Sequence, residues 1–311
     1  MPRKKKLPLW LVIVLAAVLA VLLIVIVMIV LDKDESVSLQ QAQTESATAE
    51  PARKLSAEST SLPDPLTLPT IIPHKGVALI MDDVGYDMHA LKRILDLSIP
   101  VAISVLPGAP FASESASLSQ QHGQTVMLHL PMEPLVPKYQ KLMTDTFLRA
   151  DMSEEELRHT FLQDLKKVPY VEGVNNHMGS LLTQLERPMR WVMRVCQEKG
   201  LFFIDSRTSS TSVAAELAAS MGIAWASRRY FLDHQLNEQA MEQAWNNAMA
   251  CAEKGLRCIV IAHPHEETIS FLEKHLTKAN IALMLPVKRL LKSAPLKPEQ
   301  APKGKPMEQQ L

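Results

Sequence analysis

Short apolar runs alternate with longer amphipathic segments between residues 77 and 285, and this alternation limits the possible folds more than any other feature of the chain. The runs have the length of buried strands, and the segments between them carry helix signals such as the capping-box spacing of Ser153 and Glu156. Consecutive parallel strands require crossover connections, which helices of this length supply. The sequence therefore predicts an α/β domain built on a parallel sheet.

About seven or eight strand–helix units favour a distorted β/α barrel of the TIM type with about seven strands, and a doubly wound open sheet is the alternative. We expect helices that begin close to Asp87, Ser153, Pro188 and Thr268, and two more over residues 213–221 and 238–254. The expected strands cover residues 77–81, 101–106, 125–128, 171–175, 201–204, 223–226, 258–262 and 281–285.

An unbroken apolar run over residues 7–31 predicts one transmembrane helix, because a span needs about 20 apolar residues. Basic residues precede the run and acidic residues follow it, so the N-terminus is expected in the cytoplasm. We therefore predict a single-pass protein of the bacterial inner membrane with its C-terminal domain in the periplasm; cleavage of the apolar segment at a late site is the alternative. The expected organisation is a basic stub over 1–6, the anchor over 7–31, a disordered linker over 32–73, the domain over 74–292 and a disordered tail over 293–311.

The charges of the chain balance, with 33 basic and 33 acidic residues and a formal net charge of zero at pH 7. Nothing in this balance indicates a nucleic-acid partner. The three cysteines, Cys196, Cys251 and Cys258, lack the spacing of a zinc site and could form at most one disulfide. Buried free thiols are the favoured interpretation.

Polar side chains follow most of the predicted strands. The carboxyl ends of parallel strands meet at one end of a barrel, where loops build functional sites. Any single member would be an ordinary polar loop residue, but carboxylates and imidazoles gathered in one cavity suit a divalent metal. These strand-end residues are Asp82 and Asp83, His129 and Glu133, Asn175 to His177, Asp205 to Arg207, Arg228, Arg229, Asp233 and His234, and finally His263 and His265.

Residues 77–85, Val-Ala-Leu-Ile-Met-Asp-Asp-Val-Gly, resemble the first motif of polysaccharide deacetylases, and specifically of their divergent branch. Further segments that resemble this branch cover residues 129–134, 175–180, 203–208 and 261–265, in the expected order. The resemblance implies a distorted β/α barrel and a metal-dependent amide or ester hydrolase that acts on acetylated sugars.

By position, the resemblance implies that Asp82 is the general base and Asp83 the aspartate ligand of the metal. His263 corresponds to the general acid, and Asp205 to the carboxylate that tunes that histidine. The expected reaction removes acetyl groups from an envelope polysaccharide such as a peptidoglycan-like glycan.

The chain departs from the main family at the metal-binding histidine pair, which is spaced His-x-x-x-His there. The equivalent here is His129 with Glu133. We expect Asp83, His129 and His177 to hold a divalent metal, with zinc as the expected ion and Glu133 as a supporting or alternative ligand. Asn176, Arg207 and His265 are further candidates.

Because of this departure, a non-catalytic glycan-binding or scaffold protein that keeps the barrel is the main alternative function. A hydrolase of phosphoesters, with Arg228 and Arg229 binding phosphate, is a third hypothesis.

Overall fold

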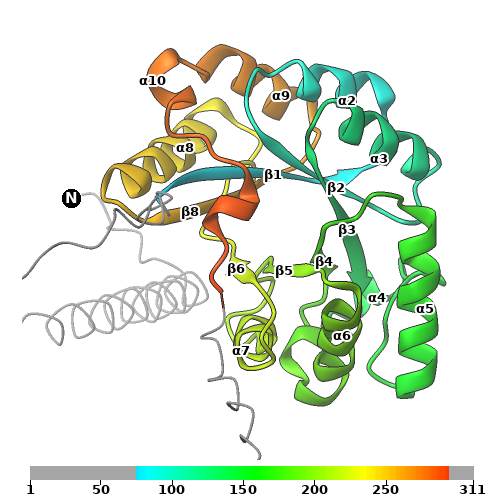
Figure 1. The fold of residues 1–311 in the computed structure, drawn as a ribbon. Coiled ribbons are helices and arrows are strands. Elements are labelled where there is room, and N and C mark those ends of the chain that lie inside the picture. Colours follow the sequence, from blue (N-terminus) through cyan, green and yellow to red (C-terminus); the bar gives the residue numbers. More distant parts are fainter. Residues whose placement is uncertain (1–74, 294–311) are drawn as a thin grey trace, which may run out of the picture. The chain divides into compact units, whose positions relative to one another are not determined.

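Eight parallel strands joined by helical crossovers form the centre of the domain in the computed structural model, which describes residues 75–293 (Figure 1). The strand order β6-β5-β4-β3-β2-β1-β8-β7 follows the chain around without the reversal point of a doubly wound sheet. The strands are β1 (Gly76–Val84), β2 (Val101–Val105), β3 (Thr125–Met132), β4 (Gly173–Met178), β5 (Phe202–Asp205), β6 (Trp225–Ser227), β7 (Tyr230–Phe231) and β8 (Arg257–Ala262).

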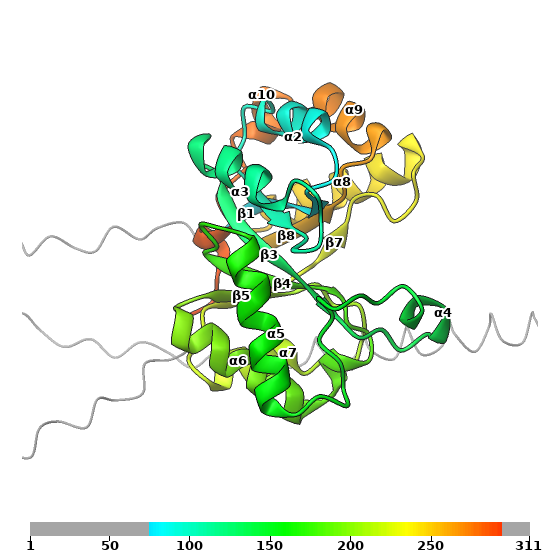
Figure 2. The ribbon, with the colours of Figure 1, turned by 90° about the vertical axis from the view of Figure 1, so that its right-hand side faces the viewer.

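The helices cover the outside of the curved sheet (Figures 1 and 2). Their ends follow the sequence signals: the Asp87 side chain caps α2, Ser153 and Glu156 form a capping box on α5, and Gly200 ends α6 in the left-handed conformation. The helices are α2 (Met88–Leu95), α3 (Ala112–Gln121), α4 (Pro137–Gln140), α5 (Glu154–Lys167), α6 (Glu186–Lys199), α7 (Ala214–Ser220), α8 (Glu238–Glu253), α9 (Glu266–His275) and α10 (Lys278–Ile281), with 3₁₀ turns η1 (Leu182–Gln184) and η2 (Val287–Leu290).

Successive strand residues face opposite sides of the sheet, and the two sides have separate apolar cores. The outer core packs the strands against the helices. The inner core includes Ala78 and Ile80 of β1, Met127 of β3 and Ile259 and Ile261 of β8, and η2 adds two side chains to it. Gly173 makes room in this core, since a Cβ atom there would lie 2.2 Å from the ring of Phe202.

The two edges of the sheet are linked by one segment, residues 225–231. Its first half pairs with β5, and its second half pairs with β8. Between the two halves, the N–H of Arg228 donates to the carbonyl of Asp205 and the N–H of Arg229 donates to the carbonyl of Ile259, both at 2.9 Å. The domain is therefore a parallel α/β half-barrel whose edge strands are consecutive in the chain, in line with the predicted barrel.

The predicted strand over 281–285 is wrong. Thr277 caps the short helix α10 there by accepting from the N–H of Asn280, and Met284 makes only an isolated bridge to Val77. Helix α3 and strand β7 were not predicted, because α3 is rich in serine and β7 has two residues. Helix α9 begins at Glu266, two residues before the expected start.

The prediction of three free thiols is wrong for two of them. Cys251 and Cys258 form a disulfide with a Cα–Cα distance of 6.3 Å, whereas Cys196 is free and buried as expected. The turn after α8 returns the chain into β8, so residues seven apart in sequence face each other across the join.

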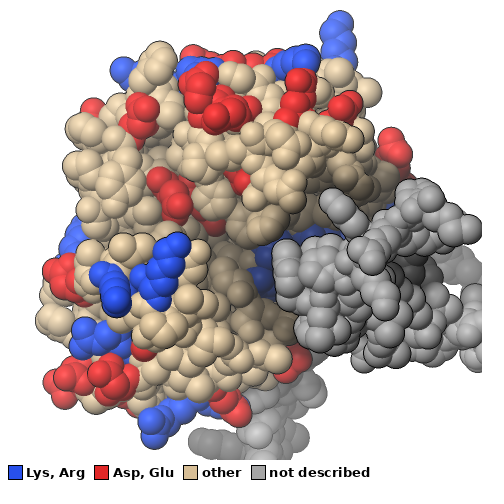
Figure 3. All heavy atoms as spheres, turned by 180° about the vertical axis from the view of Figure 1, so that it is seen from behind, with Lys and Arg blue, Asp and Glu red and all other residues tan. Residues whose placement is uncertain are grey.

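No helix within residues 75–293 is long and apolar enough to cross a membrane. The predicted stub, anchor and linker, and residues 294–311 of the predicted tail, lie outside the described residues. On the face shown in Figure 3, acidic and basic side chains of the described domain are interspersed.

Candidate active site

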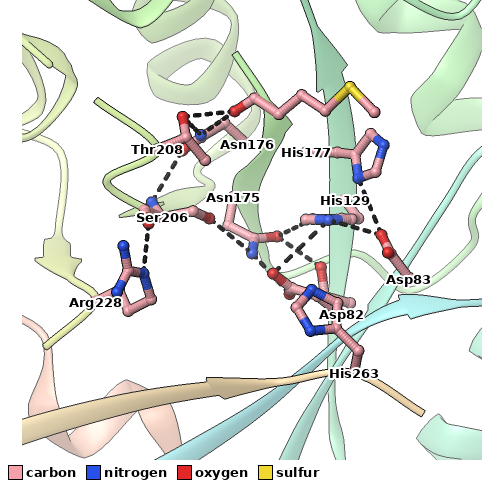
Figure 4. A network of polar contacts seen from close by, with 12 residues as sticks. Asp82, Asp83, His129, Asn175, Asn176, His177, Ser206, Thr208, Arg228 and His263 are labelled. Atoms are coloured by element: carbon pink, nitrogen blue, oxygen red, sulfur yellow. Dashed lines mark hydrogen bonds and ion pairs between the residues drawn. The ribbon is translucent and has the colours of Figure 1, made fainter. Parts of the chain in front are cut away.

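A layer of polar side chains lies above the inner apolar core, at the carboxyl ends of the strands. It arises from the two-residue period of the strands: each polar residue comes two positions after an inward-facing one, as Asp82 follows Ile80 and His263 follows Ile261. The period therefore brings residues from six strands or the loops that follow them into one place (Figure 4). The layer contains Asp82, Ser104, His129, Asn175, Ser206 and His263.

Asp83 reaches the same site although strict alternation would turn it toward the helices. The β1–β2 register shifts between Met81 and Val84, and Asp83 has a φ of 56°, in the left-handed region that aspartate tolerates better than most residues. Gly85 allows the chain to pass close to the loop after β2, because a Cβ atom there would lie 2.6 Å from that of Ala109. This irregularity lets two adjacent carboxylates serve one site.

Asp83, His129 and His177 form the first group of possible metal ligands, with one ligand atom from each lying within 4.8 Å of the others. Oδ1 of Asp83 lies 3.2 Å from Nε2 of His129 and 2.9 Å from Nδ1 of His177. Neither contact has hydrogen-bond geometry, so this buried oxygen has no hydrogen-bond partner. Burial raises the pKa of Asp83, but the two imidazoles outweigh it and hold the pKa well below its usual range.

These donors fit a divalent cation. Nδ1 of His129 donates to Oδ1 of Asn175 at 3.0 Å, which leaves Nε2 to face Asp83 as a ligand atom. One carboxylate oxygen and two imidazole nitrogens are a donor set that zinc accepts, with a further position left for water or substrate. The unpartnered buried oxygen of Asp83 is thus available as a ligand atom.

Asp82 is 2% exposed and is held by Asn175, whose Nδ2 donates to its Oδ1 at 2.8 Å. Its Oδ2 lies 3.7 Å from Nε2 of His129. Burial raises the pKa of Asp82, although the charges of His129 and His263 and the Asn175 hydrogen bond oppose it. Asp82 is therefore a carboxylate with an increased tendency to take up a proton.

His263 is oriented by Asp233. Oδ2 of Asp233 accepts from the His263 backbone N–H at 2.6 Å and from the Thr268 hydroxyl at 2.9 Å, and its Oδ1 accepts from Nδ1 of His263 at 3.0 Å. Burial alone would lower the pKa of His263, but the hydrogen bond and charge of Asp233 raise it to about 9. The ring of Phe231 stacks on that of His263, with centroids 5.4 Å apart.

The prediction that Asp205 tunes His263 is therefore wrong. Asp205 stands on the opposite face of β5 from the inward-facing Ile204 and Ser206, and its Oδ1 accepts from the N–H of Arg207 at 2.8 Å. Burial raises the pKa of Asp205. Asp233 was noted as a strand-end residue, but its distance of 30 residues from His263 gave no signal of their contact.

Glu133 does not join the group of possible ligands. Its Oε2 accepts from the N–H of Ala150 at 2.7 Å and its Oε1 accepts from Gln140 at 3.3 Å, so it fastens the loop after β3. The expectation that Glu133 supports or replaces a ligand is not met by this geometry, because its carboxylate points into its own loop.

The other candidates surround the site. Oδ1 of Asn176 accepts from the N–H of Ser206, and its Nδ2 donates to the carbonyl of Met178, so Asn176 ties β4 to the loop after β5. Arg207 is exposed with a φ of 48°. His265 is exposed, with its ring 5.9 Å from that of His263; the two form a second group of possible ligands with Asp233, in which Asp233 is already hydrogen-bonded.

Asn175 was noted as a strand-end residue, but sequence reasoning gave it no role. It accepts from His129 and from the Ser104 hydroxyl at 2.6 Å, and it donates to Asp82 and to Ser206. One amide thus orients both the proposed base and a proposed ligand. Its place in the inward series of β4, level with His129 of β3, was the signal that could have identified it.

Comparison with known proteins identifies relatives of this chain in sequence and in fold. The chain is 34% identical over 198 residues to the uncharacterized protein YibQ of Escherichia coli (strain K12), a match that covers 64% of this chain and 61% of YibQ. It is 30% identical over 197 residues to an uncharacterized protein of Haemophilus influenzae, covering 63% of this chain and 69% of that protein. The chain thus spans about three fifths of the length of YibQ.

Among solved structures, the uncharacterized protein ATU2773 from Agrobacterium tumefaciens C58 superposes with a TM-score of 0.64 at 18% identity, covering 70% of this chain and 89% of that one. This likeness shows the fold. The family model described as divergent polysaccharide deacetylase matches residues 79–291, which include all the residues of the site. The chain therefore belongs to the divergent polysaccharide deacetylase family, as its segments indicated.

Proposed function

We propose that this chain is a metal-dependent hydrolase that removes acetyl groups from an envelope polysaccharide, with zinc as its metal. The family supports deacetylase-type chemistry on a carbohydrate. The observation that carries the proposal is the arrangement around Asp83, His129 and His177: a buried carboxylate, Asp82, stands beside them, and a histidine that favours its protonated form, His263, ends the neighbouring strand.

Asp82 and His263 have the properties of a general base and a general acid. Asp82 accepts a proton from the attacking water, and its raised pKa suits that task. His263, held protonated by Asp233, donates a proton to the leaving nitrogen or oxygen as its bond to the acetyl carbon breaks. A divalent cation at the three ligands would supply Lewis-acid polarisation and acidify water. The products are acetate and the free amine or hydroxyl of the sugar.

We further propose that the domain faces the periplasm behind an N-terminal anchor. The predicted span over residues 7–31 supports this orientation through its flanking charges. The disulfide between Cys251 and Cys258 supports it independently, because disulfides persist in oxidising compartments and are rare in the cytosol.

The test is acetate release by the full chain from N-acetylglucosamine oligomers and from peptidoglycan, after removal of metal and again after resupply of zinc. The proposal expects release that depends on zinc and is lost in Asp82→Asn and His263→Ala. His122→Ala, which changes an exposed histidine on the surface after α3, is the matched control and should keep full activity.

A non-catalytic glycan-binding protein remains the second candidate, favoured by the absence of the second histidine of the His-x-x-x-His pair at Glu133. It predicts that the chain binds zinc and these glycans without releasing acetate from any of them. That result would refute the hydrolase and retain the binding site.

A further inference from the structure

Exposed apolar side chains of the described domain are concentrated at the end that carries the site. Ten large apolar residues are exposed among residues 75–293, and seven of them lie in loops that follow the carboxyl ends of β1, β2, β3 and β7. Single exposed apolar residues need no explanation, but a gathering at one end indicates an interaction surface. The seven are Tyr86, Phe111, Leu135, Val136, Tyr139, Leu142 and Leu236.

Four of the seven belong to one loop, residues 134–147, which follows β3 and contains α4. Figure 2 shows α4 projecting away from the body of the fold. Leu135 is 54% exposed and Leu142 is 61% exposed. We call residues 135–142 the apolar loop.

The apolar loop is held in this projecting position. At its base, the N–H of Leu148 donates to the carbonyl of Pro131 and the N–H of Glu133 donates to the carbonyl of Leu148, both at 2.9 Å. The N–H of Leu135 donates to the Ser180 hydroxyl at 2.9 Å, and Gln140 donates to Glu133. These hydrogen bonds therefore hold the apolar loop in its projecting position.

The apolar loop has the composition of a segment that lies in a membrane interface. It reads Leu-Val-Pro-Lys-Tyr-Gln-Lys-Leu, and no acidic residue occurs between positions 134 and 144. Lys138 and Lys141 are exposed and make no ion pair with the described residues. Apolar side chains beside lysines and a tyrosine suit the boundary between acyl chains and anionic headgroups.

A sugar chain fits this loop less well than lipid does. Of the four exposed apolar side chains of the loop, Tyr139 has a ring and a hydroxyl that could contact a sugar, whereas Leu135, Val136 and Leu142 have neither. Transfer of their exposed apolar surface from water to the acyl chains of lipid lowers the free energy.

We propose that the apolar loop inserts into the surface of an anionic lipid bilayer. Phe147, at the base of the same loop, lies with its ring 6.0 Å from that of His177, so insertion would bring the site next to the lipid surface. On the proposed function, this orientation selects acetylated sugars carried at the membrane surface. The contact with lipid itself depends on neither the metal nor the reaction.

The test places a fluorophore that responds to polarity on the apolar loop of the full chain. Leu142→Cys supplies the only accessible thiol, because Cys196 is buried and Cys251 and Cys258 are bonded to each other. The labelled chain is combined with nanodiscs of phosphatidylcholine alone or mixed with phosphatidylglycerol. We expect a severalfold rise in fluorescence on the anionic discs, and quenching by spin-labelled lipid.

Tyr170→Cys is the matched control, since Tyr170 is 57% exposed but lies before β4, at the opposite end of the sheet. Its label should stay in an aqueous environment on both discs. Lys138→Glu with Lys141→Glu should return the label at position 142 to the aqueous signal. The proposal is overturned if position 142 stays aqueous on anionic discs, or if position 170 responds as strongly. Because no substrate or zinc is present, failure here is distinct from failure of the proposed hydrolase.

Discussion

Two carboxylate–histidine groups stand in this site, and they differ in how well their polar atoms are satisfied. Both oxygens of Asp233 accept hydrogen bonds, from His263 and from Thr268, so this pair is complete without any ligand. Oδ1 of Asp83 lies between two imidazoles and accepts from neither. A buried oxygen without a partner is costly. The comparison indicates that the Asp233–His263 pair holds a histidine in place, whereas the Asp83 oxygen is left available as a ligand atom.

The strongest test of this difference is to neutralise each carboxylate in turn. Asp83→Asn should lower zinc affinity at least about 100-fold, because it removes a ligand and its charge. Asp233→Asn should bind zinc as the wild type does. Zinc titration by calorimetry measures both variants. Equal zinc affinity in the two variants would contradict the assignment of Asp83 as a metal ligand.

Removal of the Asp233 charge should change the pKa of His263 rather than the affinity for zinc. The pKa of His263 is raised to about 9, against the effect of burial, and the hydrogen bond and charge of Asp233 are the largest causes of the rise. If His263 must be protonated, activity falls as pH rises through its pKa, so Asp233→Asn should move the alkaline limb of the pH–rate profile to lower pH. The rate at neutral pH should fall about 10²-fold. An unchanged alkaline limb would exclude His263 as the acid.

The same pair should contribute to folding stability over a defined range of pH. A histidine whose pKa is higher in the folded chain than its usual 6.5 stabilises the fold fully below that value, and the contribution is lost as pH rises toward about 9. Thermal melting from pH 6 to pH 10 should therefore decline more steeply for the wild type than for Asp233→Asn. Parallel curves would show that the pair contributes nothing to stability.

Asn175 holds both the proposed base Asp82 and the proposed ligand His129, and its removal should affect both. Asn175→Ala deletes the hydrogen bonds to Asp82 and His129, so we expect a fall of about 10- to 100-fold in zinc affinity and a further loss of rate. Asn176→Ala is the neighbouring control: it should lower the melting temperature through lost loop bonds while zinc affinity is kept. Equal zinc loss in both variants would indicate a general disturbance of β4.

The smallest expected effect concerns Asp164, a buried carboxylate far along the chain from the site. Its Oδ2 has no hydrogen-bond partner, its Oδ1 accepts from Lys167 at 3.0 Å, and burial raises its pKa to about 6. A raised carboxyl pKa makes the fold less stable as pH rises from about 4 to about 6. Asp164→Asn should therefore raise the melting temperature by about 2 °C at pH 8 and by less at pH 5. A lower melting temperature at pH 8 would show that the pair with Lys167 dominates.

Much of the architecture was predictable because it depends on periodic patterns. The strand–helix alternation predicted a parallel sheet curved into a barrel, and the capping signals at Asp87, Ser153 and Gly200 are observed. The strand predicted over residues 281–285 was wrong because a short apolar run has no periodicity that distinguishes a strand from a helix. The disulfide was missed because spacing alone does not say that α8 and β8 meet at Cys251 and Cys258.

The sequence by itself determined the family, the parallel sheet and the set of polar residues at its carboxyl end, since these follow from local order and from the two-residue period of strands. Only the tertiary structure decided which members of that set contact one another. The irregular end of β1 turns Asp83 toward His129 and His177, and the bend after β7 brings Asp233, rather than Asp205, to His263. Both depend on backbone conformation and on contacts between distant segments, which residue spacing does not encode.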